Sequence, residues 1–587
     1  MAKQWTIRPA FSGTAGLAHS LGVPTIVAHV LGQRGYETPD AARAFLNPQL
    51  TQLHDPDALP GVMEAADRLV AAARSGEPVV IYGDYDVDGI TAAAILWKAL
   101  HLADANVRVY VPHRLEEGYG LNTEAVERLA AEGARVLVTV DCGISGGLQV
   151  ARANELGLDV IITDHHEVDP EHLPPALALV NPKLPGSPYP FRDLAGAGVA
   201  LKLAWAIGQR LSARDRVSAA FREFLVAATG LAALGTIADV VPLIGENHVL
   251  ASFGLRALAA SEHPGIVALR EVGRLQDKPI DAHHVGFVIG PRLNAAGRLG
   301  HAREAVELLT TAGPAAAMTI ARELDRQNRL RQDVEKQILE QAEEQVARVF
   351  SPDRDAAIVL AGEGWHTGVI GIVASRLVEK HHRPTILIGT AEGLAQGSGR
   401  SIPGFHLFEA LVACRRHLTN FGGHAMAAGV RLKEASVGPF REAFLAHAAK
   451  TLTPEDLTPC LHVDAEIGPA QMDLQTARLL EGLGPFGSGN PRPVFAARRV
   501  RLASAPRRIG RRGDHLTMHV TEAQRARRAV GWGMGELADA LGRAGSCGIA
   551  FTCRTSDYNP RRPEVELHLK DLWIGAYGDD RAAGEFA

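Results

Sequence analysis

Apolar runs separated by amphipathic stretches dominate the chain from residue 76 to about residue 245. The runs lie at 79–82, 107–111, 135–141, 159–163 and 178–180. Short runs of valine, isoleucine and leucine that alternate with helical segments are typical of a parallel sheet covered on both faces. We expect a helix to begin at Thr91, just after the first run. The stretch from Phe224 to Ala238 contains two glycines and is too short to span a bilayer comfortably, so it predicts a buried helix.

The hydrophobic pattern changes twice in the later part of the chain. Between Pro314 and Pro352, apolar residues recur every four positions among many charges, which predicts one long amphipathic helix. Apolar runs at 355–360 and 384–388 then predict a second α/β region, and from about residue 455 a period of two predicts a small antiparallel barrel of OB type. The predicted fold class is therefore α/β multidomain, with two α/β lobes joined by a long helix and a C-terminal β-barrel. The predicted divisions are 1–75 (helical lead-in), 76–313 (first lobe), 314–350 (connector helix), 351–453 (second lobe) and 454–575 (barrel).

Composition narrows the class of protein. The 587 residues carry a net charge of −5, and 46% are hydrophobic and 22% charged, as in ordinary globular proteins. Five scattered cysteines without C-x-x-C spacing disfavour a disulfide framework or a zinc finger and fit a reducing cytoplasm. The N-terminus lacks the apolar core of a signal peptide, so we expect a cytoplasmic chain without a membrane partner. The net charge argues weakly against nucleic-acid binding, but local basic patches matter more than the sum.

Acidic and imidazole side chains follow several predicted strands at the point where each strand ends. They are Asp84, Asp86 and Asp88 after the first run, Asp141 after the third, Asp164, His165 and His166 after the fourth, and Asp239 at the end of the buried helix. The carboxyl ends of parallel strands meet at one edge of a sheet, where ligands bind. Closely packed carboxylates repel one another unless a cation neutralises them, and oxygen ligands on short loops suit Mg²⁺ or Mn²⁺. Taken singly, each group is also consistent with a solvated turn, a satisfied buried polar residue or an arginine partner.

This set of side chains suits the hydrolysis of a phosphodiester. The charge of a phosphodiester repels hydroxide, and two metal ions can bind both the attacking water and the leaving oxygen. Such a site needs about six or seven protein oxygens and imidazoles. The chain supplies Asp84, Asp86, Asp88, Asp141, His165 and Asp239.

Four segments resemble, in order and spacing, the four motifs of the DHH phosphoesterase superfamily. They are Asp84-Tyr-Asp86-Val-Asp88-Gly, Val140-Asp141-Cys142-Gly143, Asp164-His165-His166 and Ile237-Ala238-Asp239-Val240-Val241-Pro242. Within that superfamily, the GDYDVDG form of the first motif, a later Gly-rich segment and the length are similar to the RecJ family. The members of that family are bacterial 5′→3′ exonucleases specific for single-stranded DNA. The resemblance covers about residues 75 to 575.

The resemblance implies a role for each residue of the four motifs. Asp141 would bridge two Mn²⁺ or Mg²⁺ ions, and Asp84 is a less direct ligand candidate. The firmest other ligands would be Asp86, Asp88, His165 and Asp239. For catalysis, His166 would face the phosphate or position the attacking water, and Asp164 would orient its neighbours.

Other segments carry candidates for binding the substrate. Arg298, in the segment 289–300, and Arg114 are candidates for gripping a phosphate. Two Gly-rich loops are expected at 397–401 and 421–429, and they resemble the DHHA1 domain that carries substrate in this superfamily. These loops contribute Ser398, Arg400, Ser401 and His424 as further candidates, because small residues let backbone amides approach phosphate oxygens. In the barrel, Arg507, Arg508, Arg511 and Arg512 are predicted to contact the DNA backbone, with a solvated basic loop as the alternative.

The resemblance implies a metal-dependent 5′→3′ exonuclease that degrades single-stranded DNA to mononucleotides in DNA repair and recombination. It also implies a monomer that meets single-strand-binding protein and a RecQ-type helicase. Two alternatives remain open. One is a DHH phosphoesterase for short oligonucleotides or cyclic dinucleotides, although a barrel with a basic run exceeds that need. The other is a catalytically dead DNA-binding scaffold like Cdc45, although such scaffolds lose metal ligands that are present here.

Overall fold

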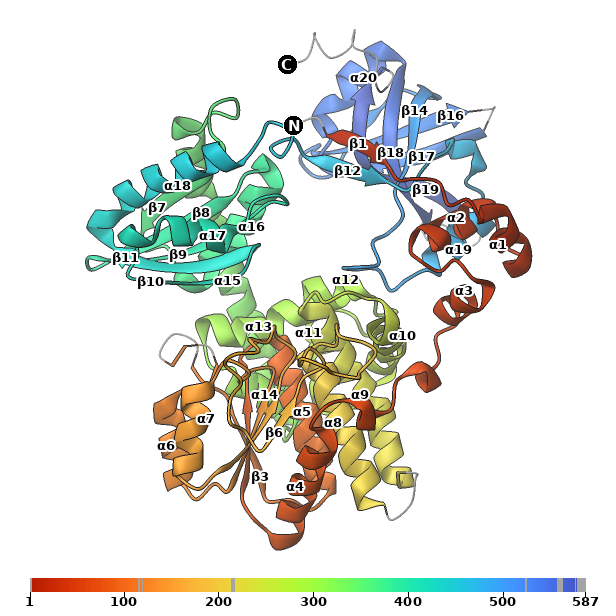
Figure 1. The fold of residues 1–587 in the computed structure, drawn as a ribbon. Coiled ribbons are helices and arrows are strands. Elements are labelled where there is room, and N and C mark those ends of the chain that lie inside the picture. The colour runs from red at the N-terminus through yellow and green to blue at the C-terminus, as the bar shows by residue number, and fades with distance from the viewer. Residues whose placement is uncertain are drawn as a thin grey trace. The chain divides into compact units, whose positions relative to one another are not determined.

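The structure is a computed structural model that describes residues 3–113, 117–118, 120–212, 217–522, 525–556, 563–575 and 577. The chain forms two compact units. Figure 1 colours the chain by residue number. One unit contains Trp5–Gly290, Ala305–Met318 and His462–Ala587, and the other contains Met1–Gln4, Pro291–Glu304 and Thr319–Leu461. The segment that carries Arg298 therefore belongs to the same unit as the second lobe.

Five parallel strands form the first sheet, as the apolar runs predicted. The strands are β2 (Val79–Gly83), β3 (Val107–Tyr110), β4 (Val136–Val140), β5 (Asp159–Thr163) and β6 (Ala178–Val180). Their order is β3-β2-β4-β5-β6, and every neighbouring pair is parallel. The chain leaves β2 for one neighbour, β3, and then returns to the opposite side of β2 as β4. In open parallel sheets, ligands bind at the carboxyl ends of the strands where the order reverses in this way.

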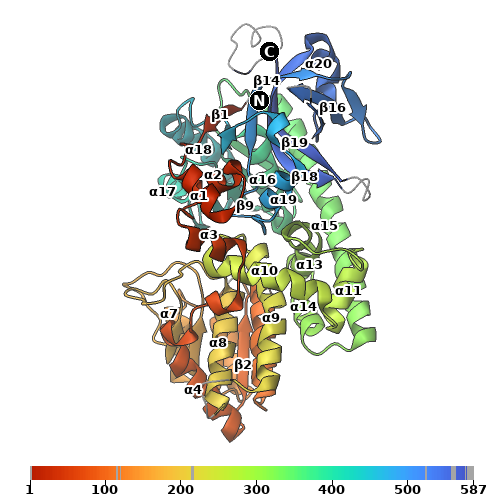
Figure 2. The same cartoon turned by 90° about the vertical axis from the view of Figure 1, so that its right-hand side faces the viewer.

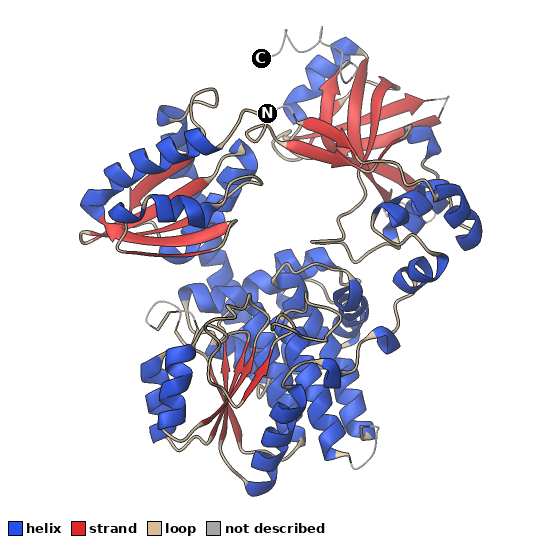
Figure 3. Ribbon diagram, viewed as in Figure 1, coloured by secondary structure: helices blue, strands red, loops and turns tan. Residues whose placement is uncertain are grey.

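Helices cover both faces of this sheet (Figure 3). They are α4 (Val62–Ser75), α5 (Val87–Leu102), α6 (Thr123–Ala131), α7 (Gly147–Glu155), α8 (Gly196–Leu211) and α9 (Ala219–Ala238). Val79 and Ile81 share one core with α4, α5, α8 and α9, whereas Val80 and Ile162 share another core with α6 and α7. Successive strand residues point to opposite faces, so strands that are buried on both sides are apolar throughout.

The helix after the first strand begins earlier than predicted, at Val87 rather than Thr91. Asp86 caps it, because its carboxylate accepts hydrogen bonds from the amides of Asp88 at 2.9 Å and Gly89 at 3.1 Å. Capping of this kind satisfies amides that have no partner within the helix. Asp88 therefore lies in the first turn of α5 and not in a preceding loop.

The predicted buried helix is α9, which packs against α5, α8 and α10 (Gly245–Ala260). By length and composition alone, α9 could cross a membrane, and so could the bent pair α1 (Thr14–Leu21) and α2 (Thr25–Gln33) taken as one span. Half of the apolar window of α9 is buried within the protein, as in the core helix of a globular protein.

A series of helices continues the chain towards the second sheet. They are α11 (Pro264–Val272), α12 (Ala282–His284), the π-helical turn η3 (Val285–Ile289), α13 (Gly290–Leu299), α14 (Arg303–Leu309) and α15 (Pro314–Val349). The Gly-flanked segment around Arg298 is thus helical. The predicted long helix is confirmed, since α15 runs without a break for 36 residues (Figure 2), and its role as a connector stays a prediction.

The second sheet is mixed, in the order β10-β11-β9-β8-β7. Its elements are β7 (Ile358–Glu363), α16 (Thr367–His381), β8 (Thr385–Ala391), β9 (Leu394–Arg400), α17 (Leu407–Ala413), β10 (Asn420–Gly423), β11 (Ala427–Lys433) and α18 (Val437–Thr451). The prediction of two Gly-rich loops here is wrong, because most of each segment lies in strands. The glycines serve packing: a Cβ on Gly397 would lie 2.7 Å from Val430 Cγ2, and one on Gly399 would lie 2.9 Å from Leu407 Cδ2.

The C-terminal strands close into the predicted barrel of OB type. They are β13 (Ala465–Glu466), β14 (Phe495–Leu502), β15 (Arg507–Ile509), β16 (His515–Glu522), β17 (Arg525–Gly531), β18 (Ser546–Ser556) and β19 (Glu564–Ile574), with helices α19 (Leu474–Glu481) and α20 (Ala538–Ala544). β14 pairs with both β18 and β16, so the strands β14, β18, β19, β17 and β16 form a closed ring.

The N-terminal helices contribute to the core of this barrel. They are α1, α2 and α3 (Pro39–Leu46), preceded by β1 (Gln4–Ile7), which pairs with β12 (Cys460–Val463). Leu31 and Phe45 belong to one buried cluster with Phe495, Leu516 and Phe551 of the barrel. Residues from both ends of the chain therefore form one core, and the first of them are more than a lead-in to the sheet.

Candidate metal centre

The structure brings all six predicted metal ligands to the carboxyl edge of the first sheet. We call this set the acidic centre: Asp84, Asp86, Asp88, Asp141, His165 and Asp239. They follow β2, β4, β5 and α9. Their ligand atoms form overlapping groups, each spanning no more than 4.8 Å: Asp84, Asp86 and Asp141; Asp88, His165 and Asp239; and Asp141, His165 and His166. The centre lies at the switch point of the sheet, between β2 and β4, where the strand order reverses.

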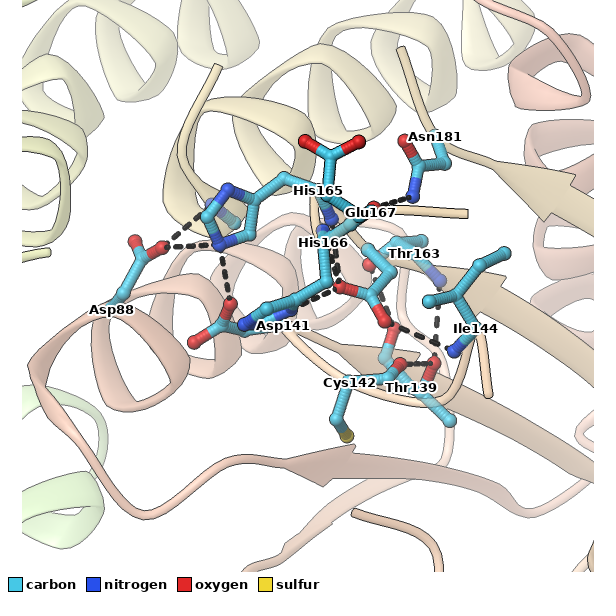
Figure 4. Close-up of polar contacts among 12 residues, drawn as sticks. Asp88, Thr139, Asp141, Cys142, Ile144, Thr163, His165, His166, Glu167 and Asn181 are labelled. Carbon is cyan, nitrogen blue, oxygen red and sulfur yellow. Dashed lines mark hydrogen bonds and ion pairs between the residues drawn. The ribbon is translucent and has the colours of Figure 1, made fainter. Parts of the chain in front are cut away.

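His165 lies at the middle of the centre (Figure 4). Its Nε2 is 3.1 Å from Asp141 Oδ1, 3.5 Å from Asp239 Oδ2 and 3.8 Å from Asp88 Oδ2. Asp88, Asp141 and His165 are buried. Among the described residues, Asp141 Oδ1 and His165 Nε2 have no aligned hydrogen bond although both atoms are inaccessible to water. Buried polar atoms without such bonds are costly, so this donor set fits a divalent cation.

The backbone holds Asp88 in its place. The amides at the start of α8 donate to both of its oxygens, Gly196 to Oδ2 at 2.6 Å and Ala197 to Oδ1 at 2.9 Å. The positive end of a helix dipole favours a carboxylate there. Carboxylates that bind metals are commonly held by such outer hydrogen bonds, which fix their orientation.

Glycines make room for the carboxylates. The sequence did not predict two of these glycines, Gly196 and Gly235, because no sequence pattern marks them. A Cβ on Gly235 would lie 2.3 Å from Asp88 Oδ1, and one on Gly196 would lie 2.7 Å from the Cβ of Asp141. Both distances are shorter than real contacts. Asp141 itself has a φ of 61°, a conformation that aspartate tolerates better than most residues. The centre thus depends on residues without side chains as much as on those with carboxylates.

The electrostatics of the centre favour binding of a cation. Burial and then repulsion by neighbouring aspartates raise the pKa of Asp88 and Asp141 well above the usual range. The same two causes raise the pKa of Asp239 to about 7. Burial, with repulsion by His166, lowers the pKa of His165 to about 3, so its ring is neutral as a metal ligand requires. A divalent cation would relieve each of these costs.

Asp164 accepts hydrogen bonds from both of its neighbours, so its position suits the predicted orienting role, which stays a prediction. Its Oδ1 accepts hydrogen bonds from the amide of His165 at 2.7 Å and from Nδ1 of His166 at 2.7 Å, and Oδ2 accepts one from the amide of Ile144 at 3.0 Å. Burial opposes the charge of Asp164, but these hydrogen bonds and the charge of His166 lower its pKa. Burial likewise opposes the charge of His166, but Asp164 raises the pKa of His166 to about 9.

One further residue supports this pair and was missed. Asn181 is buried, and its side-chain amide donates to the carbonyl oxygen of His166 at 3.1 Å. It follows β6, directly before Pro182. Its place directly after the last strand, at the same sheet edge as the acids, is the signal by which the sequence could have indicated it.

Three of the predicted phosphate contacts of the second unit, Arg298, Ser398 and Arg400, lie near the start of α16. Arg298 Nη1 donates to the carbonyl of Gly368 at 2.8 Å, and Arg400 Nη1 donates to Ser398 Oγ at 3.1 Å. Ser401 is buried, and its hydroxyl donates to the carbonyl of Phe405 at 2.7 Å. His424 is exposed after β10. Their contact with substrate stays a prediction, and Arg114 lies outside the described residues.

The four predicted DNA contacts of the barrel are all exposed. We call them the barrel arginines: Arg507 and Arg508 on β15, and Arg511 and Arg512 in the turn before β16. Arg508 pairs with Asp539 at 2.8 Å. Exposed pairs of this kind contribute little to stability, so the charge of this surface remains accessible to a partner.

Three family models match the chain. They are the DHH family, N-terminal domain (residues 78–229), the DHHA1 domain (354–452) and the RecJ OB domain (463–571). The first of these covers β2 to β6 with most of the acidic centre, and the third covers the barrel. The class of protein that the fold and site define is therefore a DHH-family protein with an attached OB domain.

Relatives over most of the chain narrow this class. The single-stranded-DNA-specific exonuclease RecJ of Bacillus subtilis is 38% identical over 577 residues, which cover 98% of this chain and 71% of the relative. The Escherichia coli protein of the same name is 39% identical, over 74% of this chain and 78% of the relative. The crystal structure of RecJ in complex with Mn²⁺ from Thermus thermophilus matches with a TM-score of 0.82 and 32% identity, over 97% of this chain and 79% of that one. The chain belongs to the RecJ family.

Proposed function

We propose that this chain is a metal-dependent exonuclease that degrades single-stranded DNA from its 5′ end to mononucleotides. The observation that carries the proposal is the complete acidic centre at the switch point of the first sheet, in a chain of the RecJ family. The curated relatives are named for single-strand-specific exonuclease activity, and a related structure was solved with Mn²⁺. The 5′ polarity, the mononucleotide product and a role in DNA repair and recombination are part of the proposal.

The residue groups support a site for two Mn²⁺ or Mg²⁺ ions. Asp84, Asp86 and Asp141 would hold one ion, and Asp88, His165 and Asp239 the other, because each group converges within 4.8 Å. Asp141 also lies 3.1 Å from His165, so it can serve both groups. Two such ions, when bound, would supply positive charge to the attacking and leaving oxygens of an in-line displacement.

The chain's own residues supply the remaining chemistry. His166 is 38% exposed at the mouth of the centre, and Asp164 holds its Nδ1 and favours its protonated form. In that form the imidazolium ring can donate a hydrogen bond to a phosphate oxygen. Asp164 and Asn181 thus hold the imidazolium ring of His166 as a hydrogen-bond donor beside the carboxylates. We assign His166 to the phosphate in preference to the water.

The barrel favours a long strand over a short substrate. OB folds are common platforms for single strands, and the barrel arginines add accessible positive charge. A dinucleotide phosphoesterase has no need of this surface, and a dead scaffold has no need of the full ligand set. We further propose a cytoplasmic monomer that meets single-strand-binding protein and a RecQ-type helicase.

The test is a single-stranded oligonucleotide carrying a label at either end, incubated with Mn²⁺ beside its duplex and a dinucleotide. We expect rapid release of mononucleotides from the 5′ end of the single strand alone. Cleavage of only the dinucleotide would favour the short-substrate phosphoesterase instead. Tight binding without cleavage under Mn²⁺ or Mg²⁺ would favour the scaffold.

A further inference from the structure

A cavity of about 700 Å³ opens beside the acidic centre within the first unit. Its walls come from the end of α9, from α12 and η3, and from the segment 481–488 after α19. The two sides are joined, because the amide of Leu243 donates to the carbonyl of Ser488 at 2.7 Å. Gly487 allows this approach, since a Cβ there would lie 2.8 Å from Leu243 Cδ1. We call this space the Phe287 cavity, after an aromatic residue that lines it.

The Phe287 cavity begins next to a metal-ligand candidate. Ala238 and Val240, which flank Asp239, both line it. Val240 is 67% exposed and has a φ of 62°, which is an outlier for a β-branched residue. Strained residues persist where the surrounding structure enforces them, often at functional sites. The turn that places Asp239 in the centre therefore also forms the rim of the cavity.

An aromatic pair faces the same cavity. Phe287 is 72% exposed, and its ring stacks on His283 with centroids 4.6 Å apart and planes 30° apart. It lies in the π-helical turn η3, a rare conformation that occurs frequently at functional sites. Large exposed aromatic rings bind flat partners that are poorly hydrated. Every nucleobase offers a flat face, so this binding does not depend on the sequence of the strand.

Guanidinium groups complete the lining. Arg492 and Arg554 both line the cavity, and Arg492 lies over the ring of Phe486 at 4.3 Å. Two acidic residues also line the cavity, and both accept hydrogen bonds from neighbouring residues. Asp281 Oδ1 accepts from the amide of His284 at 2.9 Å, and the Glu481 carboxylate accepts from Thr555 N at 2.8 Å and from Thr555 Oγ1 at 2.7 Å. Stacking surfaces combined with arginines are the features that bind single-stranded nucleic acid without sequence preference.

We propose that the Phe287 cavity holds a base of the DNA strand near the phosphate that is cleaved, with Phe287 and His283 as the stacking platform. Arg492 and Arg554 contact the phosphates on either side of that base. This inference rests on the proposed single-strand activity and adds a subsite that fixes where along the strand the enzyme recognises a base. The cavity continues to the residues on either side of Asp239, and this favours a nucleic acid over a protein side chain as the occupant.

The test scans one abasic nucleotide through a single-stranded oligonucleotide and measures binding to the full chain in EDTA, where no cleavage occurs. We expect wild type to lose about tenfold in affinity when the abasic nucleotide occupies one particular position, as for one lost stacking contact. Phe287→Leu keeps the apolar bulk without the ring, and it should bind the intact strand about tenfold more weakly and no longer respond to the abasic position. Phe287→Trp should keep the response.

A second readout places the fluorescent base 2-aminopurine at the sensitive position. Its emission should be quenched on binding to wild type and Phe287→Trp, and not on binding to Phe287→Leu. Leu394→Ala is the matched control, because it truncates a side chain of similar exposure, 71%, at the first residue of β9. This control should behave as wild type in both assays.

The outcomes separate this inference from the proposed function. A wild-type chain without any position-specific abasic effect, or equal responses in wild type and Phe287→Leu, would overturn the subsite even if cleavage proceeds. A position-specific effect that depends on Phe287 would support the subsite even if the chain never cleaves DNA, in which case the proposed function alone would fail.

Discussion

The acidic centre and the barrel arginines are both charged, but they are built in opposite ways. Side chains of the centre are mostly buried, and backbone amides and close glycines fix their positions. The barrel arginines are exposed. Among the described residues, Arg508 is the only one of the four that forms an ion pair, and this pair lies at the surface. Chemistry at a phosphorus atom requires fixed geometry, whereas attraction of a charged backbone requires only accessible charge.

This contrast predicts different sensitivities. A single change in the centre should abolish the reaction, because each side chain there has its own position and no other side chain can replace it. A single change in the barrel should matter little, because several charges share one task and salt screens each of them. The following changes test or refine this distinction.

Asp141→Asn should lower kcat on a single-stranded oligonucleotide by more than about 1,000-fold, with little loss of DNA binding, because it removes the carboxylate that we propose both ligand groups share. Asparagine tolerates the positive φ of Asp141, so the backbone should be unchanged. Asp104→Asn is the matched control, because Asp104 has a φ of 55° and is exposed. An active Asp141→Asn enzyme would rule out the bridging role.

Gly235→Ala should lower kcat by about 100-fold, because the added methyl group displaces Asp88 by the order of an ångström. Gly230→Ala in the same helix is the control, because its Cβ would meet Leu258 at an ordinary 3.4 Å. Single-turnover cleavage measures the effect, and circular dichroism checks that both variants fold. Equal activities of the two variants would show that the centre tolerates movement of Asp88.

Charge reversal of all four barrel arginines to glutamate should weaken binding of long single strands by about tenfold and of short ones much less. Replacing the same four residues with lysine keeps the charge and should keep affinity. Binding measured against salt concentration should show a smaller slope for the reversed variant only. Equal loss on long and short strands would mean that the barrel does not hold the strand.

Without metal, the free energy of unfolding should fall as the pH rises from about 6.5 to 9. The pKa of His166 is about 9 in the folded chain and near 6.5 when unfolded, so the folded state binds the proton more tightly over this range. After allowance for solvent screening, the contribution is about 1–2 kcal/mol. Urea unfolding at each pH measures the fall, and His166→Gln should make it smaller by this amount, because the raised pKa values of Asp88, Asp141 and Asp239 account for the rest. Mg²⁺ should weaken it too, because a nearby cation opposes the imidazolium charge. A flat profile in wild type would contradict this account of Asp164 and His166.

The acidic centre could be predicted from the sequence, because its ligands are chemically distinctive and each follows a recognisable strand or helix. Gly196 and Gly235 could not, since their role is to lack a side chain beside Asp141 and Asp88, which are far away in the sequence. The strands around Gly397 and Gly429 were predicted as loops because glycine hides the period of two. The core shared by Phe45 and Phe551 joins residues from opposite ends of the chain, and no local pattern reveals such a contact.

The most direct test of the central claim is calorimetric titration of Mn²⁺ into the metal-free full chain, repeated with Asp141→Asn. The account predicts two ions per wild-type chain and a clear loss of occupancy or affinity in the variant, because Asp141 serves both groups of ligands. One ion or none in wild type, or two ions bound equally well without the Asp141 carboxylate, would contradict it.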